Sequence, residues 1–372
     1  MPPLITIGIP AKNAEHTVVK CLESVLALNY TTYELIVVND GSTDTTGIII
    51  EKYKEVFNTK FGDERLKIIT TDGVGPSKAR NMIIERSAGK YLAFTDADCV
   101  VAADWLDELL KPLSLDNMNN LPTRSSWPLY KYKIACVGGD QQSPLDESQF
   151  GRYVQGFMKS VGFITGYIKP SIKNAKKKVD DYKKVDHNPT CNSLYPREIF
   201  ADLGGFVPNL YPGEDVEFDK RMKAKGYILL YNPAAIVRHY RAKTWKLFAR
   251  MMFNYGKVQA YLVRKFGLFR LIHFEPLILL CGIAVIIWFA LPGMPPVKWL
   301  MESAGILVLA GYVKFVFDSK NIKHAAVYTG LFIYTLIWWN YGFVTGLFSR
   351  SPLAEKVSTS LDINANITAV SR

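Results

Sequence analysis

Residues 91–99 read Tyr-Leu-Ala-Phe-Thr-Asp-Ala-Asp-Cys, an apolar run that ends in two carboxylates two positions apart. Side chains alternate along a strand, so Asp96 and Asp98 would point the same way in an extended segment. If the strand ends there, the two acids form a small anionic patch at its tip. Such a patch suits a hard divalent cation that keeps open positions for phosphate oxygens. Asp-x-Asp is a common pattern, so its neighbours must decide its meaning.

The residues before this pair alternate strand and helix patterns. The predicted strands and helices, in chain order, cover 4–9, 18–26, 35–38, 44–57, 66–70, 76–88 and 91–95. This order predicts an α/β fold with a doubly wound, mainly parallel sheet, whose ligands bind at the carboxyl ends of the strands. Pro10, Asp40 and the Asp96/Asp98 pair all fall at such ends. Their convergence favours a nucleotide-type site.

Composition sets the outer limits of the interpretation. The chain has 372 residues and a net charge of +11, which fits either nucleic acid or an anionic membrane surface as a partner. Its five cysteines show neither paired nor metal-ligand spacing, which indicates a reducing compartment. The chain enters a strand-like run directly, without a basic leader, so we expect no secretory signal.

The C-terminal part has long apolar runs. Residues 276–297 and 325–349 carry no charge, and 299–317 carries only Glu302 and Lys314 near its two ends. Each run is long enough to cross a hydrocarbon core, so we predict three membrane spans; buried core helices are the alternative. A short tail, 351–372, follows the third span.

Basic residues suggest how these spans are oriented. The connection after the second span carries Lys320 and Lys323, whereas the first connection carries only Lys298. The positive-inside bias therefore predicts a cytoplasmic N-terminal half. Residues 243–275 interleave basic and aromatic side chains, as in helices that lie in the headgroup plane. RNA binding is the alternative for this stretch, but its proximity to a span favours membrane lipid over nucleic acid.

Four motifs together resemble the family 2 glycosyltransferases of the GT-A fold. They are Val-Val-Asn-Asp-Gly-Ser-Thr-Asp at 37–44, Ala-Arg-Asn at 79–81, Phe-Thr-Asp-Ala-Asp at 94–98 and Gly-Glu-Asp at 213–215. The resemblance covers about residues 4–242, which we expect to form the catalytic domain 1–242. The membrane half, 276–350, is similar to a reduced cellulose-synthase architecture and to archaeal mannosyltransferases that use dolichol-linked acceptors.

The resemblance implies a donor site with a divalent cation, Mg²⁺ or Mn²⁺. Asp40 would bond the nucleobase, although Asp-Gly-Ser is also a favoured turn, and Pro10 and Asn13 would line the same site. Asp96 and Asp98, the DxD motif, would contact ribose and metal. The metal would offset the charge that builds up on the departing diphosphate.

Three basic residues are implied in donor binding, and a histidine in metal binding. Arg80 would contact phosphate or sugar, or else lie on a helix surface. His239 would bind metal or phosphate, and the flanking Arg238 and Arg241 suit a diphosphate.

The resemblance also implies the catalytic and acceptor residues. Asp215 would be the general base, because inversion at an anomeric carbon needs a proton removed as the hydroxyl attacks in line. Glu214 would hold the sugar or orient the loop, and a helix-capping role for these acids is the alternative. Asn192 and Trp245 are expected to contact the acceptor.

These observations predict a membrane-bound, inverting, metal-dependent glycosyltransferase of N-glycan or similar glycan synthesis. It would move mannose from GDP-mannose to a polyprenol- or dolichol-linked acceptor, as an integral plasma-membrane protein with a cytoplasmic catalytic domain. A polyprenyl-phosphate sugar synthase is the alternative. A processive polysaccharide synthase is disfavoured because 241–245 reads Arg-Ala-Lys-Thr-Trp instead of Gln-x-x-Arg-Trp. A channel or flippase with a degenerate head is a remote alternative. No protein partner and no nucleic acid are inferred.

Overall fold

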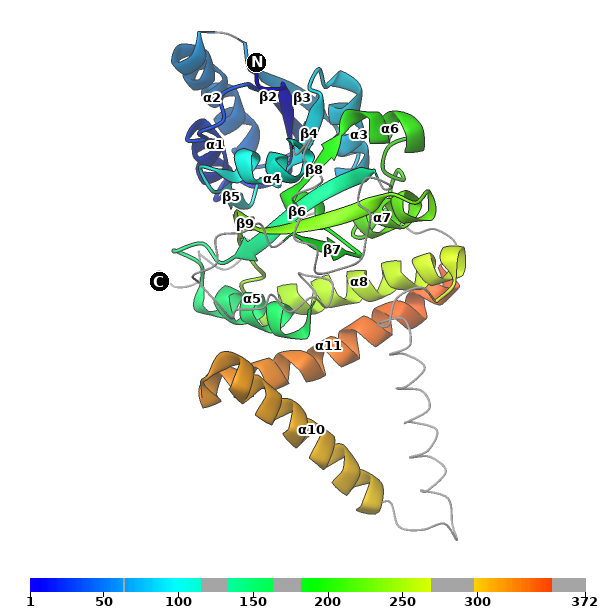
Figure 1. Cartoon of the computed structure of the whole chain (residues 1–372). Coiled ribbons are helices and arrows are strands. Elements are labelled where there is room, and N and C mark those ends of the chain that lie inside the picture. Colours follow the sequence, from blue (N-terminus) through cyan, green and yellow to red (C-terminus); the bar gives the residue numbers. More distant parts are fainter. Residues whose placement is uncertain (63, 115–132, 163–181, 269–297, 350–372) are drawn as a thin grey trace. The chain divides into compact units, whose positions relative to one another are not determined.

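The computed structural model describes residues 1–62, 64–114, 133–162, 182–268 and 298–349 (Figure 1). Two compact units divide this part of the chain. The sheet unit comprises its residues up to Pro144 and from 182 to Tyr240, and the helical unit comprises those of 145–163 and 241–352. The predicted span 276–297, the tail 351–372 and part of the predicted interfacial segment 243–275 lie outside the described residues.

One mixed, nine-stranded sheet forms the centre of the sheet unit. Its path runs through β3 (Leu66–Thr71), β2 (Tyr33–Asp40), β1 (Ile5–Ala11), β4 (Tyr91–Phe94), β8 (Ser193–Pro196), β6 (Ile134–Gln142), β9 (Ile228–His239) and β5 (Cys99–Val101), with β7 (Lys183–Val185) on β9. The first four strands of this path are all parallel. The antiparallel strand β8 then joins them to the parallel pair β6–β9.

Helices cover both faces of the sheet, as the alternating sequence pattern predicts (Figure 1). One buried cluster joins the sheet to α1 (Val18–Leu26), α2 (Thr46–Phe61) and α4 (Trp105–Ser114). The other joins it to α3 (Pro76–Arg86), α6 (Arg197–Leu203) and α7 (Glu214–Ala224). Strands buried on both faces need apolar side chains throughout, which is why Ile36, Val37 and Val38 are all fully buried. The α/β fold class is confirmed.

Two local details differ from the sequence prediction. Pro10 lies within β1 and does not end it, since β1 continues to Ala11. The ladder with β4 stops at the Gly8–Phe94 pair, so a proline two residues later interrupts no bond on that side. Asp96 and Asp98 lie beyond β4, in the turn before β5, and the alternation of a strand does not apply to them.

The helical unit contains α5 (Gln149–Val161), α8 (Trp245–Phe266), α10 (Lys298–Ser319) and α11 (Ile322–Phe348). Helices α8 and α11 approach so closely that a Cβ atom on Gly342 would lie 2.0 Å from the carbonyl oxygen of Phe253. A Cβ atom on Gly256 would lie 1.9 Å from the carbonyl oxygen of Trp339. Glycine on both helices therefore permits backbone-to-backbone packing.

Helix α11 is long and apolar enough to cross a membrane, and it is the one described helix that meets that test. The test rests on length and composition alone. Helix α10 covers the second predicted span, 299–317, as a continuous helix. Several of its apolar side chains are exposed within the unit, including Leu309 and Phe317. Crossing of the bilayer by either helix stays a prediction.

Candidate functional site

The structure brings Asp98 and His239 together at one end of the sheet. His239 is the last residue of β9, and its backbone pairs in register with Cys99, the residue after Asp98. The His239 Nε2 atom lies 3.3 Å from the Asp98 Oδ1 atom. The Asp98 side chain is 46% exposed, so its carboxylate is open to a ligand. An imidazole and a carboxylate at this spacing form a donor set suited to a divalent cation.

Asp96 has a different partner from Asp98. Its Oδ1 atom lies 2.7 Å from the Arg80 Nη2 atom, and its side chain is 27% exposed. Its backbone carbonyl accepts bonds from the Cys99 amide and the Cys21 thiol. The two acids of the motif therefore do not form one shared anionic patch. Asp98 is turned to His239, and Asp96 is held by a buried arginine.

Arg80 joins two acidic motifs that are far apart in sequence. Its Nη1 atom lies 2.5 Å from the Glu214 Oε1 atom, while Nη2 binds Asp96. The Arg80 side chain is only 2% exposed. It therefore does not lie on the helix surface, and it is not open to a nucleotide-sugar donor. Its position between Asp96 and Glu214 makes it a positioning residue that ties the DxD turn to the Gly-Glu-Asp loop.

Glu214 is buried with Arg80 at the start of α7. Burial raises the pKa of its carboxyl to about 8; the Arg80 charge opposes that rise and Asp215 adds to it. One carboxyl oxygen of Glu214 has no hydrogen-bond partner among the described residues. Two roles were predicted for Glu214, holding the sugar and orienting the loop. Its contact with Arg80 matches the second role.

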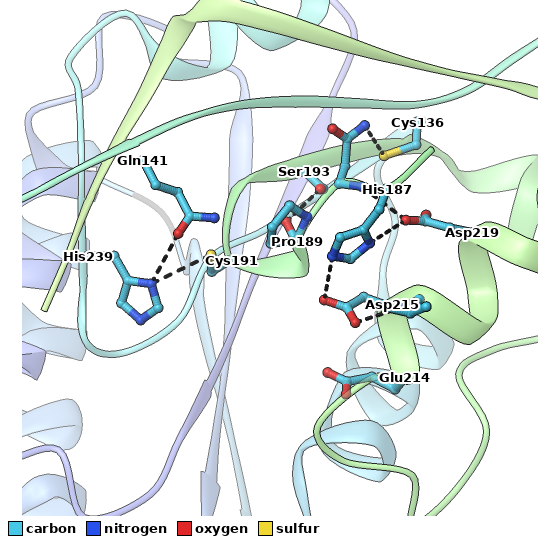
Figure 2. A network of polar contacts seen from close by, with 12 residues as sticks. Cys136, Gln141, His187, Pro189, Cys191, Ser193, Glu214, Asp215, Asp219 and His239 are labelled. Atoms are coloured by element: carbon cyan, nitrogen blue, oxygen red, sulfur yellow. Dashed lines mark hydrogen bonds and ion pairs between the residues drawn. The ribbon is translucent and has the colours of Figure 1, made fainter. Parts of the chain in front are cut away.

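The candidate base, Asp215, is the first residue of a polar network that continues through His187 to Asp219 (Figure 2). Its Oδ1 atom accepts the Val216 amide at 2.8 Å, and its Oδ2 atom lies 3.9 Å from the His187 Nε2 atom. The His187 Nδ1 atom lies 2.8 Å from the Asp219 Oδ2 atom. Asp219 and Asp215 are four residues apart on α7 and so share a helix face. His187 thus stands between a partly exposed acid and a buried one.

His187 is a site residue that the sequence reasoning missed. It lies in the segment between β7 and the 3-10 turn Thr190–Asn192, and it matches none of the four motifs. The sequence offers only a weak signal there, a histidine followed by Asn188. In the structure the backbone amide of Asn188 also donates to Asp219, at 3.0 Å. A lone histidine without a spacing pattern gives no reason to place it beside an acid about thirty residues later.

Asp40 and Asn13, which are also predicted to belong to the donor site, form hydrogen bonds that hold nearby loops in place. The buried Asp40 carboxylate accepts bonds from Thr71 Oγ1 at 2.7 Å, Val74 N at 2.6 Å and Gly75 N at 2.9 Å. Asn13, at a φ of 48°, accepts the Thr43 amide at 2.8 Å. A carboxylate offers about four acceptor positions, so the nucleobase contact stays a prediction beside this loop role.

Asn192, predicted to contact the acceptor, has no exposed surface. Its amide nitrogen donates to the carbonyls of Asp140 at 2.9 Å and Ala235 at 3.0 Å, and its oxygen accepts from Trp105 Nε1 at 2.8 Å. These contacts hold β6, β9 and α4 together. They leave Asn192 a structural role, and the acceptor contact has no support from its geometry.

The three remaining predicted residues lie on two units. Arg238 is partly buried on β9, in register with Val100. Arg241 and Trp245 belong to the helical unit. There the Arg241 Nε atom donates to Gln155 at 2.6 Å, and the Trp245 ring contacts the rings of Phe150 at 5.1 Å and Tyr334 at 5.2 Å. Their roles in donor and acceptor binding stay predictions.

Comparison with solved structures identifies the fold as GT-A-like. A mannosyltransferase from Pyrobaculum calidifontis, solved in complex with GDP-Man and Mn²⁺, superposes with a TM-score of 0.62 over 94% of this chain and 89% of its own. The two sequences are 18% identical, so the likeness concerns the fold alone. The α/β sheet of this chain agrees with that fold.

Sequence comparison matches the first third of the chain to a known family model. Residues 6–127 match the model of glycosyl transferase family 2, and the chain therefore carries a family 2 glycosyltransferase domain. The glycosyltransferase AglE of Haloferax volcanii is 26% identical over 260 residues, which cover 69% of this chain and 73% of AglE. The resemblance stated from the four motifs is confirmed.

Other relatives match over shorter stretches. The glycosyltransferase GlyA of Streptococcus pneumoniae is 35% identical over 109 residues, 29% of this chain and 15% of GlyA. An Escherichia coli UDP-Glc:alpha-D-GlcNAc-diphosphoundecaprenol beta-1,3-glucosyltransferase, WfgD, is 32% identical over 117 residues, 31% of this chain and 43% of WfgD. These matches concern only part of each relative.

Proposed function

We propose that this protein is a membrane-bound, inverting glycosyltransferase that moves mannose from GDP-mannose to a sugar hydroxyl of a polyprenol-linked acceptor at the cytoplasmic face of the plasma membrane. The observation that carries the proposal is the 3.3 Å approach of His239 to Asp98, which lies in the stretch that matches the family 2 model. Two relatives support its two halves: one structure holds GDP-Man and Mn²⁺, and one enzyme is named for a diphosphoundecaprenol acceptor.

The donor end of the site fits a divalent cation, Mg²⁺ or Mn²⁺. Asp98 offers an exposed carboxylate, and His239 offers a ring nitrogen beside it. A bound cation supplies positive charge where negative charge builds up on the departing diphosphate. Asp96 contributes differently, because its salt bridge to Arg80 fixes the turn in which Asp98 lies.

The acceptor end of the site fits proton removal by Asp215. The Asp215 carboxylate is 17% exposed, and within the described residues only its Oδ1 atom accepts a close backbone bond. With Asp219 accepting from Nδ1, a neutral His187 ring keeps its lone pair on Nε2, which faces Asp215. When Asp215 takes a proton from an attacking hydroxyl, His187 Nε2 is available as a second proton acceptor. A phosphate acceptor is already anionic and needs no base, so this arrangement favours a hydroxyl acceptor.

Attachment to the membrane is the part of the proposal that concerns the helical unit. Helix α11 has the length and hydropathy of a span. Helix α8 exposes basic side chains at Lys246, Arg250 and Arg264, which suit the anionic headgroup region. An acceptor that is itself embedded in the bilayer would be presented to an enzyme held at the same level.

The test is a transfer assay with a panel of nucleotide sugars and two lipid acceptors in vesicles. One acceptor is a polyprenyl diphosphate that carries a sugar, and the other is a polyprenyl phosphate. We expect GDP-mannose to add one hexose to the sugar-bearing lipid, detected by product mass, with an inverted anomeric configuration by NMR. Transfer only to the bare phosphate would instead identify a polyprenyl-phosphate sugar synthase. Hydrolysis of nucleotide sugar without any lipid requirement would refute a lipid acceptor.

A further inference from the structure

His239 also belongs to a second group of potential metal ligands. The Sγ atoms of Cys99 and Cys191 and a ring nitrogen of His239 all lie within 4.8 Å of one another. Cys99 begins β5, Cys191 lies in the 3-10 turn Thr190–Asn192, and His239 ends β9. The three come from separate parts of the chain, which is why their spacing in sequence shows no metal-ligand pattern. We call them the thiol–imidazole cluster.

The two ring nitrogens of His239 face different chemistry. Nε2 lies 3.3 Å from the Asp98 carboxylate. Nδ1 lies 3.9 Å from the Cys191 thiol and 3.5 Å from the Gln141 side-chain oxygen. Figure 2 marks both contacts with dashed lines. Hard cations prefer the carboxylate side, whereas thiophilic cations prefer two sulfurs and an imidazole.

We propose that the thiol–imidazole cluster binds a thiophilic divalent cation such as zinc, and that this cation excludes the hard cation of the transfer reaction. Two cysteines and one histidine leave a fourth tetrahedral position open, as in known catalytic zinc sites. Zinc bonded at 2.3 Å to sulfur and about 2.0 Å to nitrogen places those two ligands about 3.6 Å apart. The Cys191–His239 separation of 3.9 Å is already close to that value.

Exclusion follows from the single lone pair of a neutral imidazole. Coordination through Nδ1 leaves the proton of His239 on Nε2. That N–H then donates to Asp98 and offers nothing to a hard cation. Each thiol gives its proton to solvent when it binds the metal. The binding half of the proposal is independent of the proposed function, and only the exclusion half rests on it.

The binding half is tested with Co²⁺ as a spectroscopic substitute for zinc, on the reduced full-length protein without donor or acceptor. We expect thiolate-to-cobalt charge-transfer absorption in the wild type, saturating near one equivalent and displaced by Zn²⁺. Cys99→Ala and Cys191→Ala should each abolish the absorption. Cys136→Ala, which removes another buried thiol of the sheet unit, should keep it. No such absorption in the wild type, or absorption in either cluster variant equal to that of the wild type, overturns the proposal.

The exclusion half is tested by the binding of GDP in the presence of a fixed concentration of Mn²⁺, followed while Zn²⁺ is added. We expect zinc to weaken Mn²⁺-dependent GDP binding in the wild type. Cys191→Ala removes one zinc ligand. The zinc concentration that half-inhibits GDP binding should therefore rise at least 10–100-fold, by analogy with the loss of residues that only support metal ligands. Equal zinc sensitivity in both proteins refutes exclusion through the cluster. Absence of Mn²⁺-dependent GDP binding in the wild type would count against the proposed function, while the cobalt result would stand.

Discussion

Arg80 shows how one buried side chain can organise a site without touching a substrate. It holds Asp96 on one side and Glu214 on the other, with 2% of its own surface exposed. Burial of a charge is costly unless the charge is paired; here the Asp96 carboxylate pairs with the guanidinium, and Glu214 Oε1 accepts a hydrogen bond from it. The consequence is geometric, because the turn of Asp98 and the loop of Asp215 are fixed relative to each other through a single guanidinium.

Asp215→Asn tests the assignment of the general base. Removal of the proton acceptor should lower the rate of transfer by about 10²–10⁴-fold, the usual contribution of a positioned base. Binding of the nucleotide sugar should change little, because Asp98 and His239 are untouched. Single-turnover kinetics and calorimetric donor binding measure the two effects separately. Asp202→Asn, an exposed acid on α6, is the control. A variant that transfers at the wild-type rate would remove Asp215 from the mechanism.

Glu214→Gln tests the buried carboxyl. Its pKa is raised from an ordinary value of 4.5 to about 8, so between those values the folded state binds more protons than the unfolded state. The sign follows: this group stabilises the fold fully below pH 4.5, and the contribution is lost as pH rises through 8. Each pKa unit corresponds to about 1.4 kcal/mol.

The glutamine variant should therefore lose less stability than the wild type between pH 5 and pH 8. Melting temperatures measured across that range give the comparison, with the exposed Glu198→Gln as control. Identical pH profiles for wild type and Glu214→Gln would show that Glu214 ionises in the folded protein as it does in the unfolded chain.

At the level of elements, the contact between α8 and α11 is the most sensitive packing in the helical unit. Gly342→Ala would place a Cβ atom against backbone, where nothing can yield easily. We expect a loss of about 1–3 kcal/mol in stability, the usual cost of overpacking. Gly311→Ala on α10 has open space around the new methyl group and should be neutral or stabilising. Unfolding curves in detergent compare the two variants, and equal stability would mean that α8 and α11 do not pack in this way.

Sequence patterns predicted the strands between residues 4 and 95 well, for a physical reason. Each predicted strand from 4–9 to 91–95 overlaps an observed one, because buried parallel strands require continuous apolar runs. The family resemblance implied that Asp98 and His239 are both metal ligands, and the structure brings the two side chains within 3.3 Å of each other. By contrast, Arg80 and His187 gain their roles from partners 16 or more residues away in sequence, and no local pattern encodes such contacts.

The orientation of polar side chains was also beyond the sequence. Asn192 was predicted at the acceptor and is buried among backbone carbonyls. Asp96 and Asp98 were predicted as a pair and have separate partners. Both differences arise from tertiary hydrogen bonding, which depends on where β6, β8 and β9 meet.

At the level of the whole molecule, the chain contains a stretch that matches the family 2 model and a helical unit with an apolar helix of spanning length. If α11 crosses the bilayer, the protein should remain in the membrane pellet after washing with alkaline carbonate and should be released only by detergent. Quantitative immunoblotting of the fractions measures this. Release by high salt alone would indicate attachment through the basic surface of α8, and would contradict a membrane span.

The proposed function requires that Asp98 and His239 hold the donor through a divalent cation. Calorimetric titration of GDP-mannose into the full-length protein in detergent, with Mn²⁺ or with a chelator, tests it most directly. We predict binding that requires Mn²⁺ in the wild type and in the control Asp202→Asn, and that is lost in Asp98→Asn. Equally tight binding in the presence of the chelator, or undiminished Mn²⁺-dependent binding in Asp98→Asn, would contradict the claim.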